Sequence, residues 1–163
     1  MSERVNRPWL VLGVAYLGWV FDLMDVFLMV LVRESAMTEL LGPGASRQEI
    51  GVWGGWALGI TLIGWAAGGL IFGMVADRIG RARTMALTIL IYAVFTGLCG
   101  LAQTPMQLIV LRFIASLGIV GEWGAGASLI AEVFPRTSRA AAAGILQSAS
   151  ATGFFAAILL EYL

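Results

Sequence analysis

The chain places charged side chains inside stretches that are otherwise apolar. Asp22 and Asp25 lie three residues apart, so an α-helix would bring both to one face. Arg112 and Glu122 share another apolar stretch, and Gln147 lies in a third, where it could line a cavity or link two helices. A charge at the centre of a bilayer costs about 2.5–3.5 kcal/mol on insertion scales, so such residues are generally paired or functional. These residue types can carry protons and hold an anion.

The composition indicates what surrounds these residues. Of the 163 residues, 60% are hydrophobic and only 12% are charged, which is too little polar surface for a soluble domain. We therefore expect the lipid bilayer as a partner. A net charge of zero gives no reason to expect nucleic acid, and one cysteine without any histidine gives no Cys/His metal site. No metal, cofactor or catalytic residue is expected.

Five stretches reach the roughly 20 mostly apolar residues that a membrane-spanning helix needs. They predict an all-α fold, a polytopic membrane helical bundle that forms a single transmembrane domain over residues 1–163. The first stretch is too long for a signal peptide and should remain in the mature protein. The spans are expected at about 9–32, 51–75, 84–102, 106–134 and 140–163.

Arginines fall mainly on one side of these spans, and cytoplasmic connections are the ones that retain positive charge. The other side has Arg33 and Arg47, which Glu34, Glu39 and Glu49 offset. We therefore predict a multi-pass protein of the cytoplasmic (inner) membrane with its N-terminus in the cytoplasm. The arginines that support this orientation are Arg4, Arg7, Arg78, Arg81, Arg83, Arg136 and Arg139.

The expected depths of Asp22, Asp25 and Arg112 coincide. Counted at 1.5 Å per residue from an inner edge near Trp9, the two aspartates lie roughly 20 and 24 Å into a core about 30 Å thick. Arg112 lies about 6–8 Å from the outer edge by the same rise. Two carboxylates so close in a low dielectric should not both ionise readily unless the arginine compensates. Asp22, Asp25 and Arg112 are therefore a candidate proton switch, and the alternative is a static salt bridge between the two spans. For Glu122, a role in proton movement and a buried pair both stay open.

The segment GMVADRIGRART, from Gly73 to Thr84, gathers charge between the second and third spans. Its three arginines would hold a short cytoplasmic connection, and Gly80 would let the backbone reverse. Asp77 lies unfavourably beside the negative carboxyl end of a helix. It therefore needs a positive partner, which could be a nearby arginine or the amino end of another packed helix.

This segment resembles the signature between helices two and three of the major facilitator superfamily of transporters. RFIASLGIVGEWGAG, from Arg112, is similar to the fourth-helix motif, and AEVFPRTSRAAAAGI to the connection into helix five. GWVFDLMD together with GEWGAGASLIAE is most similar to the proton-coupled organic acid symporters, such as those for sialic acid, aromatic acids and lactate. The positions that match the first signature are Gly73, Asp77, Arg78, Gly80, Arg81 and Arg83.

The resemblance implies a partial N-terminal half of the major facilitator fold and a component of a secondary transporter that moves a small organic anion with protons. Asp22, Asp25 and Arg112 would then lie beside the central cavity. Asp77 and its arginines would latch the two halves together in one conformation. The missing second half, or another copy of the chain, is an expected partner, and the chain alone is not expected to transport. Leu23 and Met24 replace the usual glycine and aromatic residue between the two acids, which leaves the substrate open.

Two other functions compete with transport. The chain could be a non-transporting truncated remnant, or a small helical membrane assembly partner that uses the glycine-lined face of the second span. An intramembrane enzyme would need a nucleophile–base pair or a ligand cluster, and none accompanies Glu122, Glu132 or Glu161. Glu132 and Glu161 also fall near expected membrane surfaces, where a solvated carboxylate is ordinary.

Overall fold

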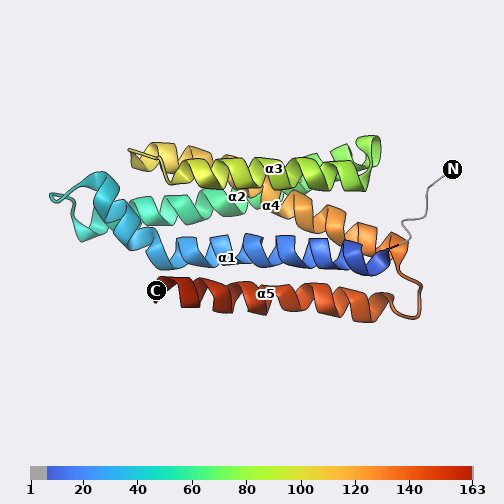
Figure 1. Cartoon of the computed structure of the whole chain (residues 1–163). Helices are drawn as coiled ribbons and strands as arrows, with labels where there is room; N and C mark the ends of the chain where they lie inside the picture. The colour runs from blue at the N-terminus through green and yellow to red at the C-terminus, as the bar shows by residue number, and fades with distance from the viewer. Residues whose placement is uncertain (1–6, 163) are drawn as a thin grey trace.

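The computed structural model describes residues 7–162, and this part of the chain folds into five α-helices (Figure 1). Each is long and apolar enough to cross a membrane. Large hydrophobic side chains such as Leu70, Leu62 and Phe155 lie exposed on the outer surface, as lipid requires. The helices are α1 (Pro8–Leu41), α2 (Arg47–Ile79), α3 (Arg81–Cys99), α4 (Pro105–Val133) and α5 (Arg139–Glu161).

Local signals in the sequence set the helix ends. Proline occupies the first turn of α1 and of α4, where its missing N–H costs nothing. Ser46 begins α2 with a capping box, in which its hydroxyl accepts from the Glu49 N–H and the Glu49 carboxylate accepts from the Ser46 N–H. Gly42 and Gly80 end α1 and α2 with φ of 84° and 91°, a region that side chains disfavour.

Four helices lie within four residues of the expected spans at each end, and α2 is the longest of these, at Arg47–Ile79 against 51–75. Helix α1 differs more, because it continues well past residue 32, to Leu41. An apolar run cannot predict this extension, because Arg33, Glu34 and Glu39 interrupt it. The extension is held by Met37, which is fully buried in a cluster with Ala57 of α2. The polar residues around it remain exposed.

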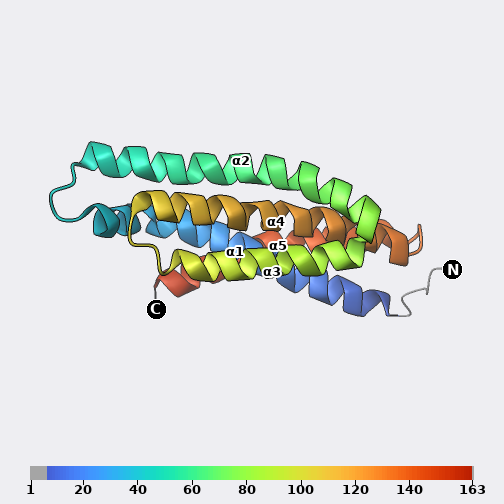
Figure 2. The same ribbon diagram turned by 90° about the horizontal axis from the view of Figure 1, so that it is seen from above.

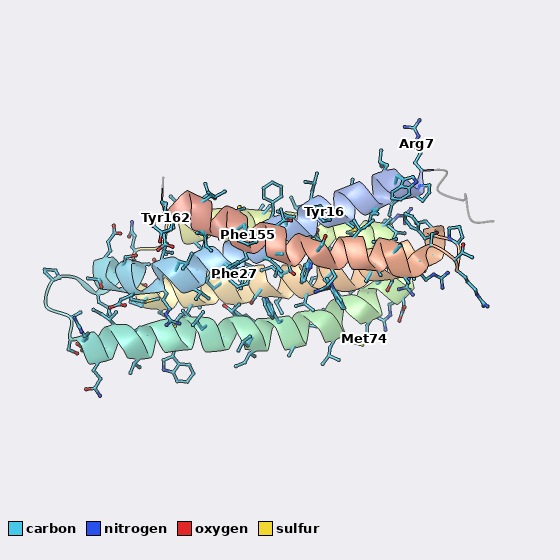
Figure 3. The ribbon with its side chains drawn as sticks, turned by 90° about the horizontal axis from the view of Figure 1, so that it is seen from below. Arg7, Tyr16, Phe27, Met74, Phe155 and Tyr162 are labelled. Atoms are coloured by element: carbon cyan, nitrogen blue, oxygen red, sulfur yellow. The ribbon has the colours of Figure 1, made fainter. Side chains whose placement is uncertain are left out.

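Helix α4 is the centre of the bundle. It packs between α2 and α3 and also along α1, while α5 packs mainly on α1. Figure 2 shows α4 between α2 and α3, and Figure 1 shows α5 below α1. In the view from below, α5 covers α1, with Tyr16 and Phe27 of α1 and Phe155 of α5 labelled along this face (Figure 3).

Glycines allow the closest approaches between helices. A Cβ added to Gly68 of α2 would lie only 2.8 Å from Leu117 Cα of α4, and one on Gly153 of α5 only 2.6 Å from the Val20 carbonyl oxygen of α1. The glycine-lined face expected on α2 is therefore used for close packing at one part of its length. It is not used at Gly51 or Gly55, where an added Cβ would meet no atom within 4 Å.

The two ends of the bundle differ in charge. The arginine-rich end has the start of α1, the α2–α3 turn and the α4–α5 connection, and it lies at the right in Figure 1. The opposite end has the α1–α2 and α3–α4 connections. Six of the seven arginines that predict the orientation belong to the arginine-rich end, and the seventh, Arg4, lies outside the described residues.

Candidate charged centre between α1 and α4

Helices α1 and α4 run antiparallel and bring Asp25 and Arg112 together. Arg112 Nη1 donates a hydrogen bond to Asp25 Oδ2 at 2.7 Å. The Arg112 side chain is 3% exposed and that of Asp25 is 14% exposed, so the pair lies away from the surface. A charge-assisted bond of this length is among the strong hydrogen bonds of proteins. The expected coincidence in depth therefore corresponds to a direct contact.

Asp22 lies one helical turn from this pair but does not join it. Its exposed fraction is 0%, and within residues 7–162 neither carboxylate oxygen has a hydrogen-bond partner. A buried carboxylate without a partner is costly. The two aspartates thus have different environments, although the sequence places them on one helix face.

Glu122 is the second buried acid without a partner. It lies ten residues along α4 from Arg112, about 15 Å nearer the arginine-rich end at the helical rise. Its carboxylate lies directly against Gly18 of α1: a Cβ added to Gly18 would overlap it, with the Glu122 Cδ only 2.9 Å away. Among the described residues no cation lies within 4.0 Å of Glu122, so the buried pair considered for it is not observed.

Helix α3 contributes polar groups that the sequence did not point to. The Tyr92 hydroxyl donates to the Phe21 carbonyl oxygen at 3.0 Å, which ties α3 to α1 next to Asp22. Thr96 and Cys99 line a pocket of about 220 Å³ together with Asp25 and Arg112. Two nitrogen atoms of Arg112, Nε and Nη2, have no hydrogen-bond partner in the described chain. In the sequence, the only indication of these α3 groups is that polar residues occur within an apolar span.

Gln147 is not brought to the charged centre. It is exposed on α5, and its side chain makes no hydrogen bond within the described residues. The polar link between α5 and α1 is formed instead by Thr152 Oγ1 and the Tyr16 hydroxyl, 2.8 Å apart. A role for Gln147 in the transport path stays a prediction.

The charged segment between α2 and α3 lies at the arginine-rich end. Gly80 forms the turn, and Arg81 Nε lies 2.7 Å from Glu132 Oε1 of α4. Glu132, interpreted from the sequence as an ordinary surface carboxylate, is therefore the partner of an arginine in this segment. Asp77 makes no ion pair within the described chain, so nearby arginines do not supply the partner that it needs.

The other residues of this segment, Gly73, Arg78 and Arg83, are exposed. An added Cβ on Gly73 would meet no atom within 4 Å, so packing inside this chain does not require a glycine there. Gly73, Asp77 and Arg81 line a pocket of about 330 Å³ between α2 and α4. The role of the segment as a conformational latch stays a prediction.

Comparison with known proteins agrees with this architecture. The family model of the Major Facilitator Superfamily matches residues 9–163. Relatives include "Probable 4-methylmuconolactone transporter" of Cupriavidus pinatubonensis, 38% identical over 91% of this chain and 33% of its own. "Cis,cis-muconate transport protein" of Acinetobacter baylyi is 35% identical over 90% of this chain and 34% of its own length. "Sialic acid transporter NanX" of Escherichia coli is 32% identical over 93% of this chain and 36% of its own length. The chain spans about a third of the length of these relatives. No solved structure matches it.

Proposed function

This chain belongs to the major facilitator superfamily, and from that premise we propose that it is part of a secondary transporter that moves a small organic anion together with protons across the cytoplasmic membrane. The named relatives are transporters of organic acids and related metabolites. They are not enzymes, so the intramembrane-enzyme alternative has no support.

The buried Asp25–Arg112 pair is the observation that carries this proposal. It joins two helices of the bundle through charges that lipid strongly disfavours. In transporters built from repeats, substrate and coupling ions bind within the membrane at the interface between structural repeats. Arg112 could hold a carboxylate through its unpartnered Nε and Nη2 atoms, because guanidinium forks match carboxylates.

Asp22 supports proton coupling rather than a static bridge. One arginine needs one carboxylate, and Asp25 already fills that place. Asp22 is buried one turn away, and Glu122 lies further along the same α1–α4 interface. In our proposal these carboxylates take up and release protons as the ion pair opens and closes, and the latch segment around Asp77 biases the two conformations.

The test uses the complete transporter that contains this segment, reconstituted in liposomes. Asp25→Asn should abolish substrate accumulation driven by a proton gradient, while the protein remains folded and inserted. Glu39→Gln is the matched control, because Glu39 is an exposed carboxylate on the same helix. If the Asp25→Asn protein accumulates substrate as steeply with the gradient as the parent, Asp25 is not the coupling group and the static bridge is the better interpretation.

The 163-residue chain itself provides a second test. Because we expect the binding site to need another half or another copy, the purified chain in liposomes should show no saturable uptake of sialate, lactate or benzoate under an inward proton gradient. Saturable, gradient-dependent uptake would contradict that expectation and indicate self-association into a complete path. The truncated-remnant and assembly-partner alternatives predict that no complete protein containing this segment transports.

A further inference from the structure

Two buried acidic side chains approach each other where α4 crosses Gly18 of α1. The Glu122 carboxyl lies directly over Gly18: an added Cβ there would overlap Glu122 Oε1 and lie 3.5 Å from Oε2. Gly18 is four residues before Asp22, so the two lie on one face of α1. Cβ atoms at this spacing are about 5–6 Å apart, which places the Glu122 carboxyl roughly that far from the Asp22 Cβ.

The two acidic side chains also lean towards each other. The Cα–Cβ bonds of a helix tilt towards its amino end. Helix α1 begins at the arginine-rich end of the bundle and α4 begins at the opposite end (Figure 1). Asp22 therefore leans towards Gly18, and Glu122 leans back towards Asp22. A rotation of the longer Glu122 side chain, or one bridging water, spans the gap that is left between the two carboxyl groups.

Neither of these acids has a counter-ion. The carboxyl oxygens of Asp22 and Glu122 are all buried and lack a hydrogen-bond partner within residues 7–162. Arg112 is occupied by Asp25, and in the described part of the chain no three side chains gather that could ligate a metal ion. Two carboxylates so close in a low dielectric do not both ionise readily. The ion that can neutralise them here is therefore a proton.

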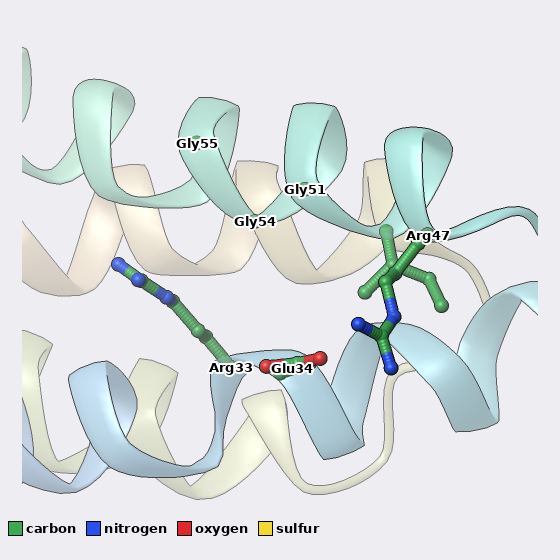
Figure 4. Close-up of a pocket in the computed structure, with 7 residues that line it drawn as sticks. Arg33, Glu34, Arg47, Gly51, Gly54 and Gly55 are labelled. Atoms are coloured by element: carbon green, nitrogen blue, oxygen red, sulfur yellow. The ribbon is translucent and has the colours of Figure 1, made fainter.

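The other charged groups lie away from these two acids, except for Asp25 and Arg112. Tyr92 of α3 lies next to Asp22, but its hydroxyl already donates to a main-chain carbonyl oxygen of α1. The charged residues of α2, α3 and α5 lie in the terminal turns of those helices. Towards the end opposite the arginine-rich end, exposed charged residues line a pocket of about 250 Å³ between α1 and α2, namely Arg33, Glu34 and Arg47 (Figure 4).

An apolar cluster separates the two acids from the arginine-rich end. Ala15 lies three residues before Gly18, and Ala125 lies three residues after Glu122; both are buried members of this cluster. Towards the opposite end lies the ion pair between α1 and α4. The two acids therefore lie between an apolar layer and an ion pair, which keeps their surroundings low in dielectric and strengthens the interaction between them.

We propose that Asp22 and Glu122 form a proton-binding site whose two carboxyl groups titrate as one unit, and that Gly18 is the positioning residue of this site. A side chain at position 18 would occupy the place of the Glu122 carboxyl and move it away from Asp22. In the exchange, the O–H bond of one carboxyl group breaks as the O–H bond of the other forms, so no further reactant is needed. The use of this proton in transport rests on the proposed function, whereas its binding depends on these three residues alone.

The test follows the protonated carboxyl groups of the purified chain in lipid by infrared spectroscopy as the pH is changed. Asp22→Asn and Glu122→Gln identify the titration steps of the site, because each removes one carboxyl group. Each should also shift the midpoint of the carboxyl group that remains by about one pH unit or more, as interacting sites do. Gly18→Ala should shift both midpoints, because it separates the two carboxyl groups.

Gly13→Ala is the matched control on the same helix. An added Cβ on Gly13 would meet no atom within 4 Å, so this variant should titrate like the parent. The proposal is overturned if Gly18→Ala titrates like Gly13→Ala. Should Gly18→Ala lose its helical circular dichroism, Glu122→Gln decides, and an unchanged midpoint of Asp22 overturns the proposal.

A measurement on the complete transporter separates this site from the proposed function. In liposomes, Gly18→Ala should shift the pH profile of proton-driven uptake, and Gly13→Ala should leave it unchanged. If the infrared midpoints shift as expected but the complete transporter shows no proton-driven uptake, the proposed function fails and the proton-binding site stands. If uptake is proton-driven but the midpoints of Asp22 and Glu122 are independent, the site fails and the proposed function stands.

Discussion

The two aspartates of α1 should respond in opposite ways to replacement by asparagine, because only Asp25 is paired. Asp25→Asn leaves Arg112, with its side chain 3% exposed, without the carboxylate that accepts its N–H at 2.7 Å. A hydrogen bond to a charged group contributes about 1.5–3 kcal/mol, and breaking a buried pair costs about 3–5 kcal/mol. Asparagine keeps one oxygen that can accept the bond. We therefore expect the free energy of unfolding to fall by about 2–3 kcal/mol.

Asp22→Asn should not have this cost. The Asp22 carboxylate is fully buried, and neither oxygen has a partner within residues 7–162. Asparagine has nearly the same volume as aspartate, so the substitution breaks no ion pair and opens no cavity. We expect the free energy of unfolding to stay constant or to rise by up to about 1 kcal/mol.

The measurement is unfolding of the purified chain in mixed micelles as dodecyl sulfate is increased, followed by helical circular dichroism. Glu39→Gln, at an exposed position of α1, controls for the removal of a carboxylate as such. Adding Arg112→Met to Asp25→Asn should recover at least half of the lost free energy of unfolding, because no buried charge is then left without a partner. The reasoning from the ion pair would be refuted if Asp22→Asn and Asp25→Asn lowered the free energy of unfolding equally. It would also be refuted if the double variant Asp25→Asn/Arg112→Met were no more stable than Asp25→Asn.

Two further predictions concern helix packing and the arginine-rich end. Gly68→Leu should lower the free energy of unfolding by about 1–3 kcal/mol through overpacking, because an added Cβ already comes within 2.8 Å of Leu117 Cα. Gly73→Leu is the control: its side chain meets open space, so it should leave the free energy of unfolding nearly unchanged in the same titration. Arg81→Gln should cost less than about 1 kcal/mol, since the Arg81 and Glu132 side chains are 36% and 56% exposed. A larger cost that persists in high salt would contradict this.

The fold followed from the sequence because apolar runs of membrane-spanning length predict helices with few alternatives. Five runs predicted five helices, and comparison with known proteins confirms the family. The extension of α1 to Leu41 was missed because it has one apolar side rather than an apolar run: Met37, Leu40 and Leu41 pack in the cluster with α2, while charged residues stay exposed. Hydropathy averaged along the chain does not detect a helix that is apolar on one side only.

From the sequence, contacts in the charged centre could be predicted only where two residues lie at the same depth in the membrane. Equal depth correctly suggested that Arg112 meets an aspartate, but Asp22 and Asp25 share a helix face and depth could not choose between them. Contacts that depend on the lateral order of the helices were not foreseen. The bond from Tyr92 to Phe21 requires α3 to lie beside α1, and the Arg81–Glu132 pair requires the end of α4 to lie beside the α2–α3 turn. A single sequence contains no direct signal of that order.

The central position of α4 also has a consequence for the order of events during synthesis. Arg112 follows Asp25 by 87 residues, so at 5–20 residues per second the ribosome completes it roughly 4–17 s later. Helices α1, α2 and α3 are all made before the helix on which they pack. During that interval α1 must enter the membrane with two aspartates and without its counter-ion, by the hydrophobicity of its other residues alone. Conditions that slow elongation between α1 and α4 should therefore lengthen the period in which this nascent chain is open to quality-control proteases.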